Sequence, residues 1–108
     1  MAFDETLAAR IRDEVAGSDG ITDRKMFGGI TFMLNGNMAA GVIGDDLIVR
    51  LGAEAAPAAL AEPGVRVFDF TGKPMPNWVV VDGSRLADDH LGQWLRKGLD
   101  YAASLPPK

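Results

Sequence analysis

The spacing of hydrophobic residues near the N-terminus is that of an amphipathic helix. One apolar residue recurs every four positions and so lies on one helical face. This stripe consists of Leu7, Ile11 and Val15. Asp4 is a suitable N-cap and Gly17 a suitable C-terminal stop. We therefore predict a helix from Asp4 to Ala16, followed by a turn at residues 18–20.

The middle of the chain has the pattern of a β-meander. Asn35-Gly36 is the strongest short hairpin signal, because a type I′ turn needs two residues at positive φ. Gly44-Asp45 predicts a second turn of the same kind. Two-residue loops at both turns fix the strand register. In that register Met33 faces Met38, Val42 faces Leu47, and Ala39 faces both Phe32 and Arg50.

This register divides the side chains between two faces of the sheet. One face is apolar almost throughout, and we expect helices to cover it. It carries Thr31, Met33, Met38, Ala40, Val42, Leu47, Val49 and Leu51. The other face carries Ile30, Phe32, Leu34, Ala39, Ile43, Ile48 and Arg50. A large apolar patch is unusual on a monomer, so we expect another segment or a partner subunit to cover it.

The second half of the chain predicts two helices and two strands. The alanine-rich stretch from Gly52 to Gly64 predicts a short helix with Pro57 in its first turn, where a missing N–H is tolerated. Strands are expected over residues 65–70 and 77–82, and an earlier one near residues 23–27. A final helix is predicted from Asp88, its N-cap, to Ser104. Its buried stripe consists of Leu91, Trp94, Leu95, Leu99 and Ala102.

These elements define an α+β fold class. Their order is α-β-β-β-β-α-β-β-α, and hairpins dominate the connections. We therefore expect a mainly antiparallel sheet of about five to six strands flanked by helices. The length of 108 residues suits a single domain.

Composition excludes several classes of function. The chain has no cysteine, which removes disulfides, thiolate nucleophiles and the common zinc knuckles. Its net charge of −4 disfavours direct nucleic-acid binding, which usually needs a basic face. An acidic chain can still carry a local basic patch, so net charge alone does not exclude such binding. No apolar run has the length of a membrane span, and the N-terminus lacks the features of a signal peptide. We expect a cytoplasmic protein without membrane contact.

The sequence shows no catalytic constellation. His90 is the only histidine, and a lone histidine cannot build a metal site. The nucleophile motif GxSxG is absent. Gly28-Gly29 precedes a predicted strand, whereas phosphate loops precede a helix, so we interpret the pair as a tight connection or bulge. We expect no metal, no cofactor and no enzymatic activity.

Arg24, Arg50, Lys73 and Trp78 are the residues that best fit a binding site. A buried arginine needs an acidic partner or a bound anion, and an internal acid is the favoured interpretation for Arg50. Trp78 fits the core or an interface better than a ligand-stacking role. Together with Phe27, Gly28, Gly29 and Phe32, these residues form the candidate ligand-binding or partner-binding set.

Three segments give the chain a resemblance to the N-terminal domain of the TfoX/Sxy family. They are RKMFGGITFMLNGNMAAGV, DDLIVRLG and GKPMPNWVVVD. Residues 26–29 match the family's Met-Phe-Gly-Gly segment, Arg50 its basic strand end, and Trp78 its Pro-x-x-Trp-like strand. The resemblance implies a secretion-chaperone-like α+β fold in which residues 1–108 form one TfoX N-terminal-like domain.

The resemblance also implies a kind of function. Named members of the family regulate natural competence in bacteria, acting with other proteins on transcription, and carry a C-terminal domain that this chain lacks. No catalytic residue carries over. The leading hypothesis is a stand-alone, non-enzymatic regulatory or protein-binding module that forms a homodimer. One alternative is a small-anion or metabolite-binding domain using the Arg50 face of the sheet, and another is a nucleic-acid-associated accessory protein.

Overall fold

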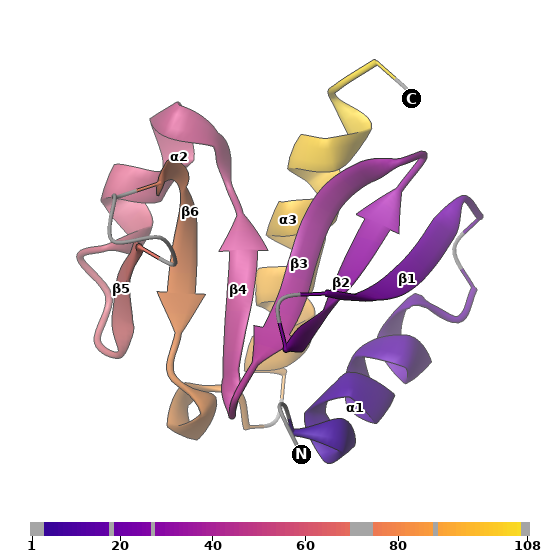
Figure 1. The fold of residues 1–108 in the computed structure, drawn as a ribbon. Helices are drawn as coiled ribbons and strands as arrows, with labels where there is room; N and C mark the ends of the chain where they lie inside the picture. The colour runs from indigo at the N-terminus through magenta and orange to yellow at the C-terminus, as the bar shows by residue number, and fades with distance from the viewer. Residues whose placement is uncertain (1–3, 18, 27, 70–74, 88, 107–108) are drawn as a thin grey trace.

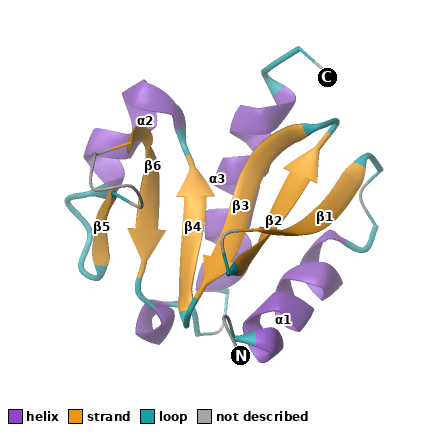
Figure 2. Cartoon of the chain, in the orientation of Figure 1, coloured by secondary structure: helices purple, strands orange, loops and turns teal. Residues whose placement is uncertain are grey.

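A computed structural model describes residues 4–17, 19–26, 28–69, 75–87 and 89–106. The elements in chain order are α1 (Glu5–Val15), β1 (Ile21–Met26), β2 (Gly29–Leu34), β3 (Asn37–Ile43), β4 (Asp46–Arg50), α2 (Gly52–Ala59), β5 (Val65–Phe68), β6 (Met75–Val81), the 3-10 turn η1 (Gly83–Arg85) and α3 (His90–Ala103). This order confirms the predicted arrangement of helices and strands and the α+β class. Figure 2 shows the distribution of the two kinds of element.

The strands form one six-stranded sheet in the order β1-β2-β3-β4-β6-β5. Every neighbouring pair is antiparallel. All three helices contribute buried residues to the same large core cluster, on one face of the sheet (Figure 1). The described part of the chain is therefore a two-layer structure, with helices on one face only. None of the described helices has both the length and the apolar character needed to cross a bilayer.

The core lies between the sheet and the helices. Its largest fully buried side chains are Phe32, Ile11, Ile30, Leu47, Leu86, Leu91, Val42, Val49, Val79 and Val81. They come from α1, α3, four strands and, in the case of Leu86, the segment between η1 and α3, so the layers are held together by apolar packing.

Helix α1 begins as the sequence predicts. The Asp4 carboxylate accepts hydrogen bonds from the backbone N–H groups of Thr6 and Leu7, at 2.9 and 3.1 Å. These bonds satisfy donors that the first turn leaves unpaired. Leu7, Ile11 and Val15 are all buried, which confirms the predicted apolar stripe.

Both predicted two-residue loops are confirmed, but only Asn35-Gly36 has the predicted type I′ conformation, because at the second turn Gly44 has a φ of 60° and Asp45 is not among the described residues with positive φ. Asn35 and Gly36 have φ values of 53° and 85°, as a type I′ turn requires. Leu34 pairs with Asn37 across this turn. Ile43 pairs with Asp46, so Gly44-Asp45 is also a two-residue loop.

The predicted register is wrong beyond the first pairs of β2 and β3. Met33 pairs with Met38 as expected, but Phe32 pairs with Ala40 instead of Ala39. Ala39 is thus an extra residue in β3, which is the arrangement of a β-bulge. The bulge moves Phe32 and Ile30 onto the helix-covered face, where both are almost fully buried. Thr31 and Met33 accordingly belong to the opposite face.

Two helix predictions also need correction. Helix α2 ends at Ala59 and contains Pro57 in its interior, not in its first turn. Proline cannot donate to the carbonyl four residues earlier, which is consistent with a helix this short. Helix α3 begins at His90 with Asp89 as N-cap, whereas the predicted N-cap Asp88 lies outside the described residues.

Helix α3 approaches β3 closely at Gly98. A Cβ atom built on Gly98 would lie 2.5 Å from the carbonyl oxygen of Ala39 and 3.1 Å from Cγ1 of Val49. Real Cβ atoms do not come this close to a backbone oxygen. The missing side chain at Gly98 therefore lets the helix rest directly on the bulge.

Candidate functional site

The structure disperses the residues that the sequence placed in one candidate site. Arg24 is exposed on the edge strand β1, and Arg50 lies on β4. Strands β2 and β3 lie between them, and neighbouring strands are about 4.8 Å apart, so the two backbones are separated by at least roughly 14 Å. Arg50 and Trp78 are register partners on adjacent strands. Phe27 and Lys73 lie outside the described residues.

Three predicted site residues have structural roles. Gly28 has φ of 75° in the connection between β1 and β2. Gly29 begins β2, where its backbone approaches the Val42 carbonyl so closely that a Cβ would collide with it. The glycine pair thus leads into a strand, as the bulge or tight-connection interpretation predicted. Phe32, also named in the candidate set, is 1% exposed and lies in the main core.

Arg50 has a different environment from the predicted internal ion pair. Its Nη1 donates to the Met38 carbonyl oxygen at 3.4 Å, and its guanidinium carbon lies 5.5 Å from the centre of the Tyr101 ring on α3. Within the described ranges, no carboxylate forms a salt bridge with it. Its Nε atom is buried and has no hydrogen-bond partner. Among the described residues, the charge is therefore offset by a carbonyl dipole and an aromatic face.

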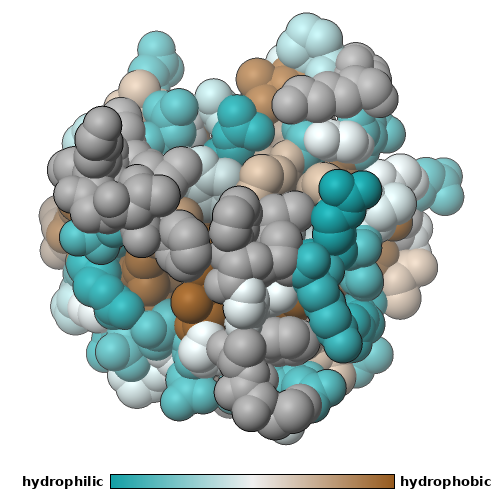
Figure 3. Space-filling model, viewed as in Figure 1, coloured by the Kyte–Doolittle hydropathy of each residue, from teal (hydrophilic) through white to brown (hydrophobic). Residues whose placement is uncertain are grey.

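Trp78 belongs to a second apolar cluster, on the face of the sheet opposite the described helices. Ile48, Trp78 and Val80 are its buried members, and Met38, Ile43 and Phe68 pack against them half-buried. The rings of Phe68 and Trp78 lie 6.0 Å apart at an interplanar angle of 57°. Figure 3 looks onto this face and shows hydrophobic side chains between hydrophilic ones. We refer to these six residues as the sheet-face cluster.

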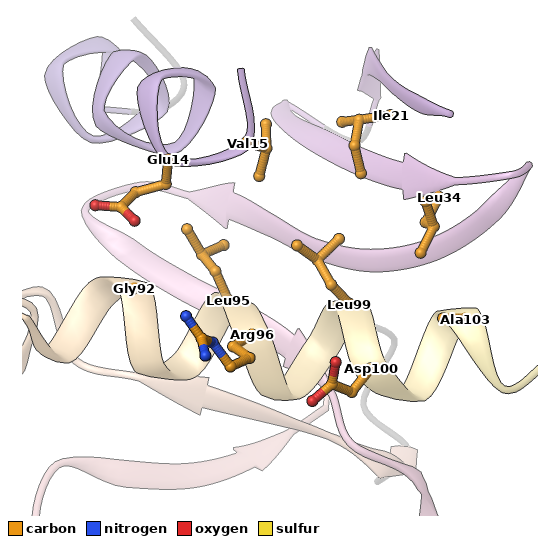
Figure 4. Close-up of a pocket in the computed structure, with 10 residues that line it drawn as sticks. All are labelled: Glu14, Val15, Ile21, Leu34, Gly92, Leu95, Arg96, Leu99, Asp100 and Ala103. Atoms are coloured by element: carbon orange, nitrogen blue, oxygen red, sulfur yellow. The ribbon is translucent and has the colours of Figure 1, made fainter. Parts of the chain in front are cut away.

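A cavity of about 310 Å³ lies between α1, α3 and the adjoining ends of β1 and β2. Its apolar walls are Val15, Ile21, Leu34, Leu95, Leu99 and Ala103. Figure 4 shows Val15, Ile21 and Leu34 pointing toward Leu95 and Leu99 across the space. Glu14, Arg96 and Asp100 add charged groups to the lining, and Gly92 completes it.

Sequence reasoning missed this cavity and its charged residues. Arg96 and Asp100, four residues apart, share one side of α3, which the sequence could have indicated. Their proximity to Glu14 depends on how α1 and α3 pack against each other, and no local pattern encodes that packing.

Among the described residues, no group of three or more histidine, aspartate or glutamate side chains could hold a metal ion.

The fold and these surfaces define a small α+β protein whose described helices all cover one face of the sheet. The family model described as the TfoX N-terminal domain matches residues 13–102 of the 108-residue chain. The chain belongs to this family. Searches of curated proteins and of solved structures find no match.

Proposed function

We propose that this protein is a small regulatory module that acts by binding other proteins, and that its sheet-face cluster binds a second copy of the chain. The observation that carries the proposal is the apolar cluster on the face without described helices. Half-buried Met38, Ile43 and Phe68 leave apolar area there that a partner would remove from water. Membership of the TfoX N-terminal domain family is the reason to look for further partners among proteins of transcription or competence regulation.

The two edges of the sheet support association through the face instead of by strand addition. The edge strand β1 carries three consecutive charged residues, Asp23, Arg24 and Lys25. The other edge strand, β5, has only four residues. Charged and short edge strands resist pairing with another chain. Two helix-free faces, by contrast, can pack at the usual sheet-to-sheet distance of about 10 Å.

The homodimer proposal is tested by Ile43→Lys. Ile43 is half-buried at the margin of the sheet-face cluster, so a lysine can reach solvent in the monomer but would place a charge inside a face-to-face interface. We expect the wild-type protein to sediment as a dimer and the variant to dissociate at least about tenfold more readily. Sedimentation equilibrium across a concentration series measures both.

Leu99→Lys is the matched control for this measurement. Leu99 is also a half-buried aliphatic residue, but it lies on α3, on the other side of the sheet. Equal loss of the dimer in both variants would exclude the sheet-face cluster as the interface. A wild-type protein that stays monomeric at high micromolar concentration would exclude the homodimer.

A second candidate function, small-anion binding at Arg50, is favoured by the surroundings of that side chain. Arg50 has a buried Nε–H without an acceptor and no carboxylate in salt-bridge reach within the described ranges. An unpaired buried donor is costly, and an anion would satisfy it. Helix α2 begins two residues later without a side-chain cap, so its first N–H groups add donors nearby.

Inorganic phosphate is the probe for this second candidate. We expect it to shift the Nε–Hε resonance of Arg50 in a saturable manner and to raise the melting temperature, with about 1.4 kcal/mol of stabilisation at ten times Kd. Arg50→Met should abolish the binding-dependent rise. Arg66→Met is the control, because Arg66 is exposed and already paired with Asp46 at 2.8 Å. The same rise in both variants would indicate a general salt effect and no site at Arg50.

A further inference from the structure

We propose that the cavity between α1 and α3 binds a small zwitterion with an aliphatic body, of which a free aliphatic α-amino acid is the simplest example. The volume of about 310 Å³ is at the lower end of the range for small-molecule sites. The site is separate from the sheet-face cluster and from Arg50, so the inference does not depend on the proposed function.

The walls of the cavity select an aliphatic body. The described residues of its apolar lining are all aliphatic, and none of them has an aromatic ring for stacking a planar ligand. Of the aliphatic side chains that line it, Val15 and Leu95 are buried, whereas Ile21, Leu34 and Leu99 are half-buried. A branched alkyl group between them (Figure 4) would remove this remaining apolar area from water.

The charged residues of the cavity select a head group with both signs of charge. Glu14 comes from α1, and its carboxylate lies over α3 at Gly92, where an added Cβ would be 3.1 Å from Oε2 of Glu14. Arg96 follows one turn later on α3, and Asp100 one turn after that. Along the length of α3 the cavity thus presents the Glu14 carboxylate from α1, then Arg96, then Asp100.

None of these three charges is engaged within the described part of the protein. Glu14, Arg96 and Asp100 form no side-chain hydrogen bond and no salt bridge there. The guanidinium of Arg96 can bind a carboxylate through two parallel hydrogen bonds, and an ammonium group can pair with Glu14 or Asp100. An α-amino acid carries both groups on one carbon, which fits charges one helical turn apart.

Ligands with a single charge fit the same residues less well. A fatty acid would pair with Arg96 but place its carboxylate beside two acids, and an alkylamine would leave Arg96 without a partner. Both would still fill the aliphatic walls. The comparison of these three classes therefore separates recognition of the zwitterion from simple apolar binding.

The test is a titration of the methyl-labelled protein, followed by NMR, with L-leucine. We expect saturable shifts of the Ile21, Leu34, Leu95 and Leu99 methyl groups. L-Leucinamide, which lacks the carboxylate, and 4-methylpentanoate, which lacks the ammonium group, should each bind at least about tenfold more weakly. L-Serine, with the same head but no aliphatic body, should cause no saturable shift of these methyl groups.

Arg96→Ala and Lys97→Ala form the matched pair of variants. Both remove one exposed positive charge from α3, but Lys97 lies over the Trp94 ring, 4.6 Å from its centre, and lines the adjoining hollow beyond Arg96 and not the aliphatic cavity itself. We expect Arg96→Ala to weaken leucine binding at least about tenfold and Lys97→Ala to leave it nearly unchanged. Since both residues are exposed, circular dichroism should show both variants folded.

Two results would overturn the inference. One is the absence of saturable methyl shifts up to about 10 mM leucine, which would limit any binding free energy to about 3 kcal/mol. The other is equal affinity for leucine and 4-methylpentanoate, which would show that the cavity binds alkyl groups without recognising the zwitterionic head group.

Discussion

Replacing Phe32 by alanine is expected to lower the free energy of unfolding by about 3–5 kcal/mol, the usual cost of truncating a buried phenylalanine. Phe32 is 1% exposed and lies in the core between the sheet and the helices. Its removal would leave a cavity that the close-packed surroundings fill only in part. Urea denaturation of the variant and of the wild-type protein gives the difference.

Met33→Ala is the matched control. With the bulge, Phe32 lies on the helix-covered face and Met33 on the opposite face, which is the reverse of what the regular register predicts. Met33 is half-buried and pairs with Met38 on the helix-free face. We expect its truncation to cost only about 1 kcal/mol. A larger loss for Met33→Ala than for Phe32→Ala would mean that β2 and β3 pair without the bulge at Ala39.

Replacing Gly98 by alanine is expected to destabilise the protein by about 2 kcal/mol, although alanine is the better helix former. The new Cβ would lie 2.5 Å from the Ala39 carbonyl oxygen, and a backbone atom cannot turn aside as a side chain can. Either α3 lifts from the sheet or β3 shifts, and both loosen the core. The free energy of unfolding in urea measures this effect as well.

Gly92→Ala tests the same substitution on the same helix without the collision. Its added Cβ would be 3.1 Å from Oε2 of Glu14, the flexible end of an exposed side chain. We expect a stability within about 1 kcal/mol of the wild type, with a gain favoured by helix propensity. Equal stabilities of the Gly92 and Gly98 variants would show that α3 does not rest on β3 as closely as described.

The element order and the turns could be predicted because their signals are local. Asn35-Gly36 and Gly44-Asp45 each fix a two-residue loop by their own conformational preferences, and Asp4 marks the start of α1 by its capping side chain. These features need no knowledge of the rest of the fold. The family resemblance, carried by the glycine pair, the basic strand end and the tryptophan, was confirmed over residues 13–102.

The bulge and the cavity could not be predicted because they depend on packing between distant segments. An extra residue at Ala39 leaves the apolar pattern of β3 intact, yet it moves Phe32 to the other face of β2. Likewise, the contact of Arg50 with Tyr101 joins residues on β4 and α3 that no short-range pattern connects. Of the predicted site residues that the structure describes, only Arg50 and Trp78 are register partners.

Because every described helix lies on one side of the sheet, neighbouring residues of a single strand serve different layers. On β4, Leu47 and Val49 are fully buried under the helices, while Ile48 between them belongs to the sheet-face cluster. A change at Ile48 alters the outer face and leaves the helix-covered core in place. The chemistry of that face can therefore diversify among descendants of this chain at every second position, while the intervening residues preserve a foldable protein.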